Sequence, residues 1–267
     1  MRLLLTLNKS FARIFSFPVI IKGVKVYFNS ADRFLAAMLW KTGRLEGFEM
    51  ELFSRFVKPR ITMLDIGANM GVYSLTSSNV IGDKGKIIAF EPDKDHVKTF
   101  TKSIKANGFE NIKLYPFAVS DKNETLVFHA DTFNSGNNQV AKENENNKNE
   151  LHVQAVCLDD FLKDMPTVDL IKMDIQGAEY FAFIGMKTLL ERNPDVVVFA
   201  EYWKKGLEKM NVNPADYINL LASFHFNFYK IDNDSRQVKQ IHTSDILNNP
   251  EFDKTFLNLI FCRNAIF

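Results

Sequence analysis

The feature that most constrains the fold of this chain is an order of elements around one glycine turn. Residues 61–66 are aliphatic and continuous, as in a buried strand, and they include Asp65. A turn bounded by Gly67 and Gly71 follows, and after it come a helical segment and a second apolar run that ends before Glu91, twenty residues after Gly71. This layout is typical of a βαβ nucleotide-binding unit, in which the second carboxylate binds a ribose diol.

Three details of the turn favour a cationic cofactor over a dinucleotide. Asp65 is an acid where a dinucleotide fold has an apolar residue or glycine, Asn69 replaces the middle glycine, and the spacing is Gly-x-x-x-Gly. An acid repels a diphosphate but suits an ammonium group. S-adenosylmethionine has an ammonium group and a ribose but no phosphate, so it is favoured over NAD. An NAD-linked oxidoreductase remains the alternative.

Composition limits the remaining classes of function. With 267 residues, 46% of them hydrophobic, the chain can bury a sizeable core in one large or two small domains. The formal net charge of +1 gives no reason to expect nucleic-acid binding. Cys157 and Cys262 lie far apart and outside any metal-binding motif. They are expected to be reduced core residues of a cytoplasmic protein.

The N-terminal residues 1–60 are expected to form a cap segment ahead of a domain that spans 61–267. Residues 1–21 are basic and apolar, with no run long enough to cross a bilayer. They form either a helix that packs on the domain or across a homodimer, or a peripheral helix on a membrane surface. The first interpretation is favoured, because an apolar stripe is ordinary core patterning.

The rest of the chain alternates between strand and helix patterns, which predicts an α/β fold. Repeated βα units imply a Rossmann-like, mostly parallel sheet with helices on both faces. Two half-exposed strands, 125–130 and 151–157, are expected to form an inserted hairpin at the edge of that sheet, around a mobile polar loop of residues 134–150. The core strands are expected at 61–66, 86–90, 112–116, 168–173, 195–200, 226–231 and 256–261, and helices at 47–57, 71–79, 94–107, 159–163, from about 178, and at 215–223.

A second strand that ends in an acid lies within residues 169–179, where Asp174 precedes a glycine turn into a helix. Ligands of open α/β sheets bind beyond the carboxyl ends of the strands. Four carboxylates on one edge are costly unless they meet cations or hydrogen-bond donors. This edge is therefore the strongest functional signal in the sequence, and its four carboxylates belong to Asp65, Glu91, Asp174 and Glu201.

At these residues the sequence resembles the FkbM-type S-adenosylmethionine-dependent methyltransferases. The resemblance covers roughly residues 48–205, and it departs from the family's pattern at Gln176, where the family usually has Glu. An amide cannot ionise, so a role of that Glu as base or metal ligand would be lost here. The motifs that carry the resemblance are Leu64 to Gly71, Phe90-Glu91-Pro92, Leu158-Asp159-Asp160-Phe161 and Asp169 to Glu179.

The resemblance implies a set of cofactor contacts. Gly67, Asn69 and Gly71 would line the methionine part of the cofactor, with Asp65 near its ammonium group, and Glu49 is a weaker candidate for the same end. Glu91, followed by Pro92, would take both ribose hydroxyls, Ala118 and Val119 would border the adenine, and Asp174 would face the sulfonium.

The family mostly methylates hydroxyl groups of sugars, glycolipids and secondary metabolites, so the resemblance implies an O-methyltransferase with such an acceptor. A hydroxyl acceptor must lose its proton, and Asp174 is the first candidate for the general base, with Glu201 the second. Each is about equally well explained as a structural carboxylate that holds loop N–H groups. No metal is expected, and a non-catalytic protein with the same fold is a further alternative, suggested by Gln176.

Overall fold

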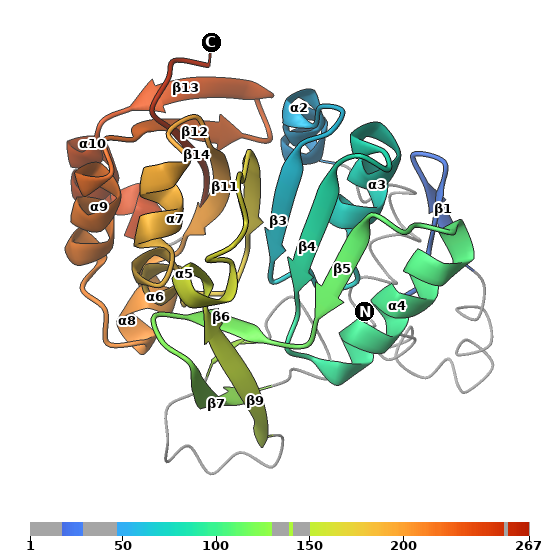
Figure 1. The fold of residues 1–267 in the computed structure, drawn as a ribbon. Coiled ribbons are helices and arrows are strands. Elements are labelled where there is room, and N and C mark those ends of the chain that lie inside the picture. Colours follow the sequence, from blue (N-terminus) through green and yellow to red (C-terminus); the bar gives the residue numbers. More distant parts are fainter. Residues whose placement is uncertain (1–17, 29–46, 130–138, 141–149, 254–255, 267) are drawn as a thin grey trace, which may run out of the picture.

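The computed structural model describes residues 18–28, 47–129, 139–140, 150–253 and 256–266. Their central feature is an eight-stranded sheet with the strand order β13-β12-β14-β11-β10-β3-β4-β5 (Figure 1). The strands are β3 (Thr62–Ile66), β4 (Lys86–Phe90), β5 (Ile112–Tyr115), β10 (Leu170–Met173), β11 (Val197–Tyr202), β12 (Asn227–Asp232), β13 (Gln237–Ile241) and β14 (Leu257–Cys262).

Most neighbouring strands of this sheet run parallel. β5, β4, β3, β10 and β11 are parallel to one another, whereas β14 pairs antiparallel with both β11 and β12, and β13 pairs antiparallel with β12. The chain proceeds outward from β3 to β5 and then returns to form β10 on the other side of β3. The strand order therefore reverses between β3 and β10, and the predicted Rossmann-like, mostly parallel sheet is confirmed.

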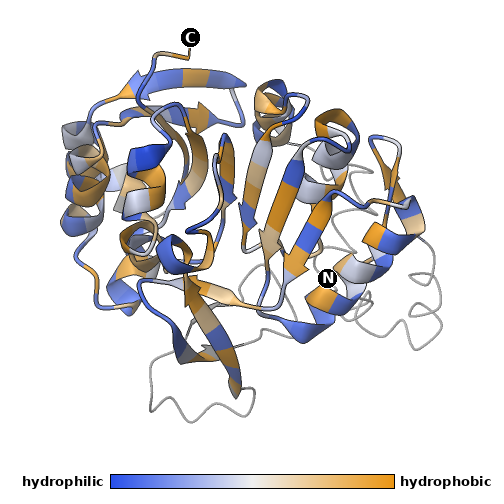
Figure 2. Ribbon diagram, viewed as in Figure 1, coloured by the Kyte–Doolittle hydropathy of each residue, from blue (hydrophilic) through white to orange (hydrophobic). Residues whose placement is uncertain are grey.

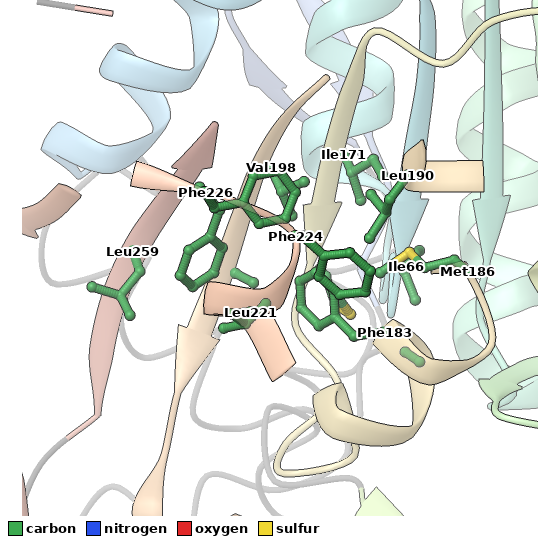
Figure 3. Packing of buried hydrophobic residues seen from close by; sticks show 14 of the residues in the cluster. Ile66, Ile171, Phe183, Met186, Leu190, Val198, Leu221, Phe224, Phe226 and Leu259 are labelled. Carbon is green, nitrogen blue, oxygen red and sulfur yellow. The ribbon is translucent and has the colours of Figure 1, made fainter. Parts of the chain in front are cut away.

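Helices cover both faces of the sheet. One face packs against α2 (Phe48–Phe56), α3 (Val72–Ile81), α4 (Lys94–Asn107) and the hairpin β1 (Val19–Ile21) and β2 (Val24–Val26). The other packs against α5 (Leu158–Phe161), α6 (Glu179–Ile184), α7 (Lys187–Arg192), α8 (Lys204–Lys209), α9 (Pro214–Ser223), α10 (Thr243–Asn248) and the 3-10 helix η4 (Pro250–Asp253). Figure 3 shows the second core, where Phe183 and Phe224 lie between the helices and the strands.

The amino-acid pattern explains why these elements form. The central strands are mostly apolar, whereas α4 carries polar and apolar residues on different faces, as expected of a helix with one face in solvent (Figure 2). The Asp93 side chain accepts hydrogen bonds from the backbone N–H groups of Asp95 and His96, which begins α4. Gly108, with a φ of 67°, ends it, so the predicted helix 94–107 is confirmed.

The insertion differs from the prediction. The two expected strands, β7 (Glu124–His129) and β9 (Glu150–Cys157), do pair antiparallel. They belong to a separate four-stranded sheet with the order β6-β9-β7-β8, and not to the edge of the central sheet. β6 (Ala118–Ser120) and β8 (Gln139–Val140) were not expected, because each is too short to show periodicity. Most of the predicted mobile loop 134–150 lies outside the described residues, but β8 falls within it.

The long helix expected from about residue 178 is divided into α6 and α7 at Gly185. A Cβ atom on Gly185 would lie 2.1 Å from the carbonyl oxygen of Ser120, so the break allows the helix end to contact β6. The helix predicted within residues 1–21 lies outside the described residues, except that residues 19–21 form the strand β1. Among the described residues, no helix is both long and apolar enough to cross a bilayer.

Candidate active site

The predicted carboxylates gather at the carboxyl ends of adjacent parallel strands. Asp65 is the penultimate residue of β3 and Glu201 of β11, while Glu91 and Asp174 directly follow β4 and β10. β3 and β10 flank the point where the strand order reverses, which is where open α/β sheets bind ligands. The candidate active site is therefore built around the two turns that follow β3 and β10.

These two turns contact each other through Gly67. Its φ is 76°, and a Cβ atom there would lie 2.1 Å from the carbonyl oxygen of Asp174. Gly71 has a φ of 78°, and a Cβ atom would overlap the ring of Phe100 in α4. Asn69 also has positive φ, and its Oδ1 accepts a hydrogen bond from the N–H of Met70 at 2.8 Å. The glycines are thus required by protein packing as well as by any ligand.

Asp65 is turned toward α3 and away from solvent. Its Oδ2 accepts hydrogen bonds from the backbone N–H of Ser74 at 3.2 Å and from the Ser74 hydroxyl at 2.5 Å. The residue is only 2% exposed, and burial raises the pKa of its carboxyl to about 6. These contacts give Asp65 a structural role in fixing α3 beneath the turn. Its predicted place beside an ammonium group stays a prediction.

Glu91 is organised by two backbone amides. Its Oε2 accepts from the N–H of Asn69 at 2.7 Å, and its Oε1 accepts from the N–H of Asp93 at 2.8 Å. His96 Nδ1 lies 3.5 Å from Oε1. Each carboxylate oxygen has a further lone pair, so this held carboxylate suits a pair of ribose hydroxyls, with half-buried Pro92 beside it.

Ala118 and Val119, predicted to border an adenine, are placed in β6 and paired with β9. Both are buried. The side chains of Tyr115 and Phe117, which precede them, are half-buried and stack with a centroid distance of 6.3 Å. Sequence reasoning missed this aromatic pair, although aromatic residues at and just beyond the end of a strand were a usable signal.

Glu49 reaches the site from α2. Its Oε1 accepts a hydrogen bond from the Tyr73 hydroxyl at 3.2 Å and lies 3.5 Å from Lys172 Nζ. The Glu49 backbone N–H donates to Asn233 Oδ1 at 3.0 Å, in the connection between β12 and β13. Sequence reasoning missed Lys172 and Tyr73, because a lysine inside an apolar strand shows no partner in one sequence.

Asp174 is exposed, and its Oδ1 accepts a hydrogen bond from the Gln176 amide at 2.7 Å. An ionised Glu in place of Gln176 could not donate this bond. Glu179, a site residue that sequence reasoning did not single out, holds the same turn: its carboxylate accepts from the N–H groups of Ile175 and Gly177. Burial raises the pKa of Glu179 to about 7.

Glu201 faces the same cluster but is 8% exposed. Burial first, and then the charges of Asp174 and Glu179, raise the pKa of Glu201 to about 9. A carboxyl group with that pKa is protonated near neutral pH and donates a hydrogen bond instead of accepting a proton. Of the two predicted bases, Asp174 is therefore better suited to that role in this structure.

The carboxylates at this edge of the sheet suit a ligand that carries cationic groups and a ribose. The side chains that face the β3–β10 switch point are mainly carboxylates, and the ammonium of Lys172 already lies against Glu49. Such an edge repels a diphosphate and attracts the ammonium and sulfonium groups of S-adenosylmethionine. Glu91 provides acceptors for the ribose hydroxyls.

Comparison with known proteins finds distant relatives that are named as methyltransferases. The 2-O-methyltransferase NoeI of Sinorhizobium fredii is 24% identical over 190 residues, covering 65% of this chain and 76% of that protein. A protein of Sulfurisphaera tokodaii, described as a probable cobalt-precorrin-6B C(15)-methyltransferase (decarboxylating), is 23% identical over 150 residues, covering 52% of this chain and 78% of that one. The FkbM methyltransferase structure from Methylobacillus flagellatus aligns with a TM-score of 0.45 and 14% identity, covering 79% of this chain and 50% of that chain.

The family itself is shown by a model of the methyltransferase FkbM domain, which matches residues 65–245. That range is more than half of the 267 residues and includes both turns of the site. The NAD-linked alternative is thereby set aside. The chain belongs to the FkbM family of methyltransferases and is an S-adenosylmethionine-dependent enzyme.

Proposed function

We propose that this enzyme is an O-methyltransferase whose acceptor is a hydroxyl group of a sugar, glycolipid or secondary metabolite. The observation that carries the proposal is the position of Asp174, an exposed carboxylate at the end of β10 and in contact with the Gly67 turn. NoeI is named as a 2-O-methyltransferase, which supports oxygen as the acceptor atom. The precorrin enzyme is named for a carbon position, so the acceptor atom needs direct measurement.

The proposed cofactor contacts follow from which carboxylate oxygens remain available. Glu91 binds the ribose hydroxyls, and the turn of Gly67, Asn69 and Gly71 lines the methionine part. Asp65 is engaged by Ser74, so Glu49 is the better placed carboxylate for the ammonium group. Ala118 and Val119 contribute to the adenine side through β6.

When bound, S-adenosylmethionine supplies an activated methyl group, and the protein's part is alignment and proton removal. The Oδ1 of Asp174 is held by Gln176, and Oδ2 makes no hydrogen bond with the described residues. Oδ2 would accept the proton that the acceptor hydroxyl loses when its oxygen takes the methyl group from the sulfonium, whose sulfur–methyl bond breaks to leave the neutral thioether. Protonated Glu201 carries no charge and so keeps the local negative charge low.

The experiment is transfer of a labelled methyl group to a panel of sugars, glycolipids and small polyols. On any acceptor found, Asp174→Asn is expected to lower kcat by about 10²-fold or more, as loss of a general base does. Asp164→Asn, the same change at an exposed aspartate beyond α5, serves as the matched control. An unchanged kcat in Asp174→Asn would exclude Asp174 as the base.

If no member of the panel is methylated although the cofactor binds, the acceptor does not belong to these classes of hydroxyl compound. Partners and location also belong to the proposal: a small-molecule or glycan acceptor, no nucleic acid, a cytoplasmic location, and an N-terminal segment that contacts either a membrane surface or a second copy. Co-sedimentation with anionic vesicles, with and without residues 1–22, tests the membrane contact. Light scattering of the same two proteins tests the dimer.

A further inference from the structure

Lys172 is a buried cation that the proposed reaction does not use. It lies in β10, directly opposite Asp65 of β3, and its side chain is 8% exposed. Its Nζ lies 3.5 Å from Glu49 Oε1 and 5.1 Å from the centroid of the Tyr73 ring. A buried lysine is costly unless it is paired, so its partners indicate what it is for.

The charge of Lys172 is maintained by its surroundings. Burial works to lower the pKa of Lys172, but the nearby acidic groups, Glu49 foremost, raise it overall, so the ammonium persists. Burial raises the pKa of Tyr73 as well, which keeps its hydroxyl neutral and able to donate. Both groups are therefore donors, and both point at the same carboxylate.

The two donors converge on one oxygen of Glu49. The Tyr73 hydroxyl and Lys172 Nζ both contact Oε1, whereas Oε2 makes no hydrogen bond or ion pair with the described residues. The Glu49 side chain is 15% exposed, so a ligand can still reach it. Asn233 holds the Glu49 backbone at the same time. Residues from two elements thus hold the carboxylate and a third holds the Glu49 backbone, with one oxygen left for a donor.

We infer that Lys172 and Tyr73 are positioning residues that hold Glu49 so that its Oε2 accepts a hydrogen bond from the α-ammonium group of S-adenosylmethionine. This inference rests on the proposed placement of Glu49 at the methionine end of the cofactor. It goes further by assigning a purpose to a buried ion pair that otherwise only attaches α2 to the sheet. A pair with a purely structural purpose would affect all ligands of the site equally.

The test is a thermodynamic cycle between protein variants and two ligands. Calorimetry measures the affinity of S-adenosylhomocysteine and of its analogue that lacks the α-amino group. In the unaltered protein we expect the missing amino group to weaken binding by about tenfold or more, as for a charge-assisted hydrogen bond. In Tyr73→Phe and Lys172→Met we expect this ratio to fall to about threefold or less, because Glu49 is no longer fixed.

Lys230→Met is the matched control: Lys230 is a half-buried strand lysine whose Nζ, like that of Lys172, lies 5.1 Å from an aromatic centroid, here that of Phe252. In Lys230→Met, the ratio of the affinities for the two ligands should equal that in the unaltered protein. If Lys172→Met does not fold, Tyr73→Phe removes only one hydroxyl and still decides the question. An equal ratio in Tyr73→Phe, or a uniform loss of affinity for both ligands, would overturn the inference.

The same experiment also tests separately whether Glu49 contacts the ammonium group. Glu49→Gln should reduce the ratio in an otherwise unaltered protein. If the unaltered protein binds both ligands equally well, Glu49 does not contact the ammonium group. The proposed position of Glu49 and the inference are then both wrong, but the identity of the cofactor is unaffected. If Glu49→Gln reduces the ratio but neither Tyr73→Phe nor Lys172→Met does, only the positioning role fails.

Discussion

Three acidic residues near the active site share burial but differ in what holds them. Asp65 accepts two hydrogen bonds from Ser74, and Glu179 accepts two from the turn after β10. No hydrogen bond joins the Glu201 carboxyl to the described residues, and its pKa is raised the furthest, to about 9. Of the three, Glu201 is therefore the residue that is most costly to ionise in the folded state.

The cost of ionising Glu201 should appear as a pH dependence of the free energy of unfolding that the variant Glu201→Gln lacks. The folded-state pKa of about 9 lies above the ordinary value of 4.5, so the folded state keeps the proton longer as pH rises. Stability of the unaltered protein therefore falls between those values, by at most about 1.4 kcal/mol per pH unit. In urea unfolding from pH 5 to 9, the free energy of unfolding of Glu201→Gln should increase relative to that of the unaltered protein as the pH rises. Glu208→Gln, the same change at an exposed position, is the control.

Gly67 and Gly82 allow the effect of close packing to be separated from that of the backbone angle. Their φ values are 76° and 69°, but a Cβ atom on Gly82 would meet nothing within 4 Å. Gly82→Ala should cost about 1–3 kcal/mol through its backbone angles alone, because a φ of 69° with a ψ of 179° is a conformation essentially restricted to glycine. Gly67→Ala should cost clearly more and also weaken cofactor binding, because Asp174 must move. Chemical denaturation and calorimetry measure the two effects, and equal costs at both positions would contradict the packing argument.

At the scale of elements, one family motif has a structural explanation. The Asp159 carboxylate accepts hydrogen bonds from the backbone N–H groups of Thr188 at 2.9 Å and Leu189 at 2.7 Å. It thereby joins α5 to the first turn of α7, where N–H groups lack partners within the helix. The motif Leu158-Asp159-Asp160-Phe161 thus stabilises the packing of two helices, away from the chemistry.

Asp159→Ala should accordingly destabilise the protein by about 1–2 kcal/mol, the usual cost of losing a helix cap. The affinity for S-adenosylhomocysteine should change little at temperatures where the variant is folded. Asp160→Ala is the neighbouring control, since within the described part of the chain the Asp160 carboxylate accepts only from the exposed Asn123 amide. Thermal unfolding together with calorimetry distinguishes the two, and a large loss of affinity in Asp159→Ala would contradict a purely structural role.

Elements with strong local signals could be predicted from sequence, and the others could not. α4 has a capping aspartate and a terminal glycine, so the predicted bounds 94–107 match the structure. β6 has three residues and pairs with β9 more than thirty positions away, so nothing local identifies it. The same limit applies to the site: Asp174 follows a recognisable strand, whereas Lys172 acquires its meaning only from Glu49 and Tyr73.

For the molecule as a whole, the site lies where the sheet's strand order reverses, and its parts come from elements far apart in sequence. Glu49 of α2, Glu91 after β4 and Asp174 after β10 meet only when the complete sheet has formed. A cofactor that contacts all three binds the folded chain and not the unfolded one. Binding should therefore stabilise the entire described sheet as one unit.

Ligand-dependent unfolding tests this expectation. Saturation with S-adenosylhomocysteine at a hundred times its Kd should raise the free energy of unfolding by about 2.7 kcal/mol, whereas NAD at the same concentration should have no effect. Glu91→Gln should reduce the stabilisation, because an amide replaces one of the two acceptor oxygens and cannot serve both ribose hydroxyls. Glu110→Gln, an exposed change before β5, should retain the full effect. Stabilisation by NAD equal to that by the thioether ligand would contradict the argument that this acidic edge excludes a diphosphate.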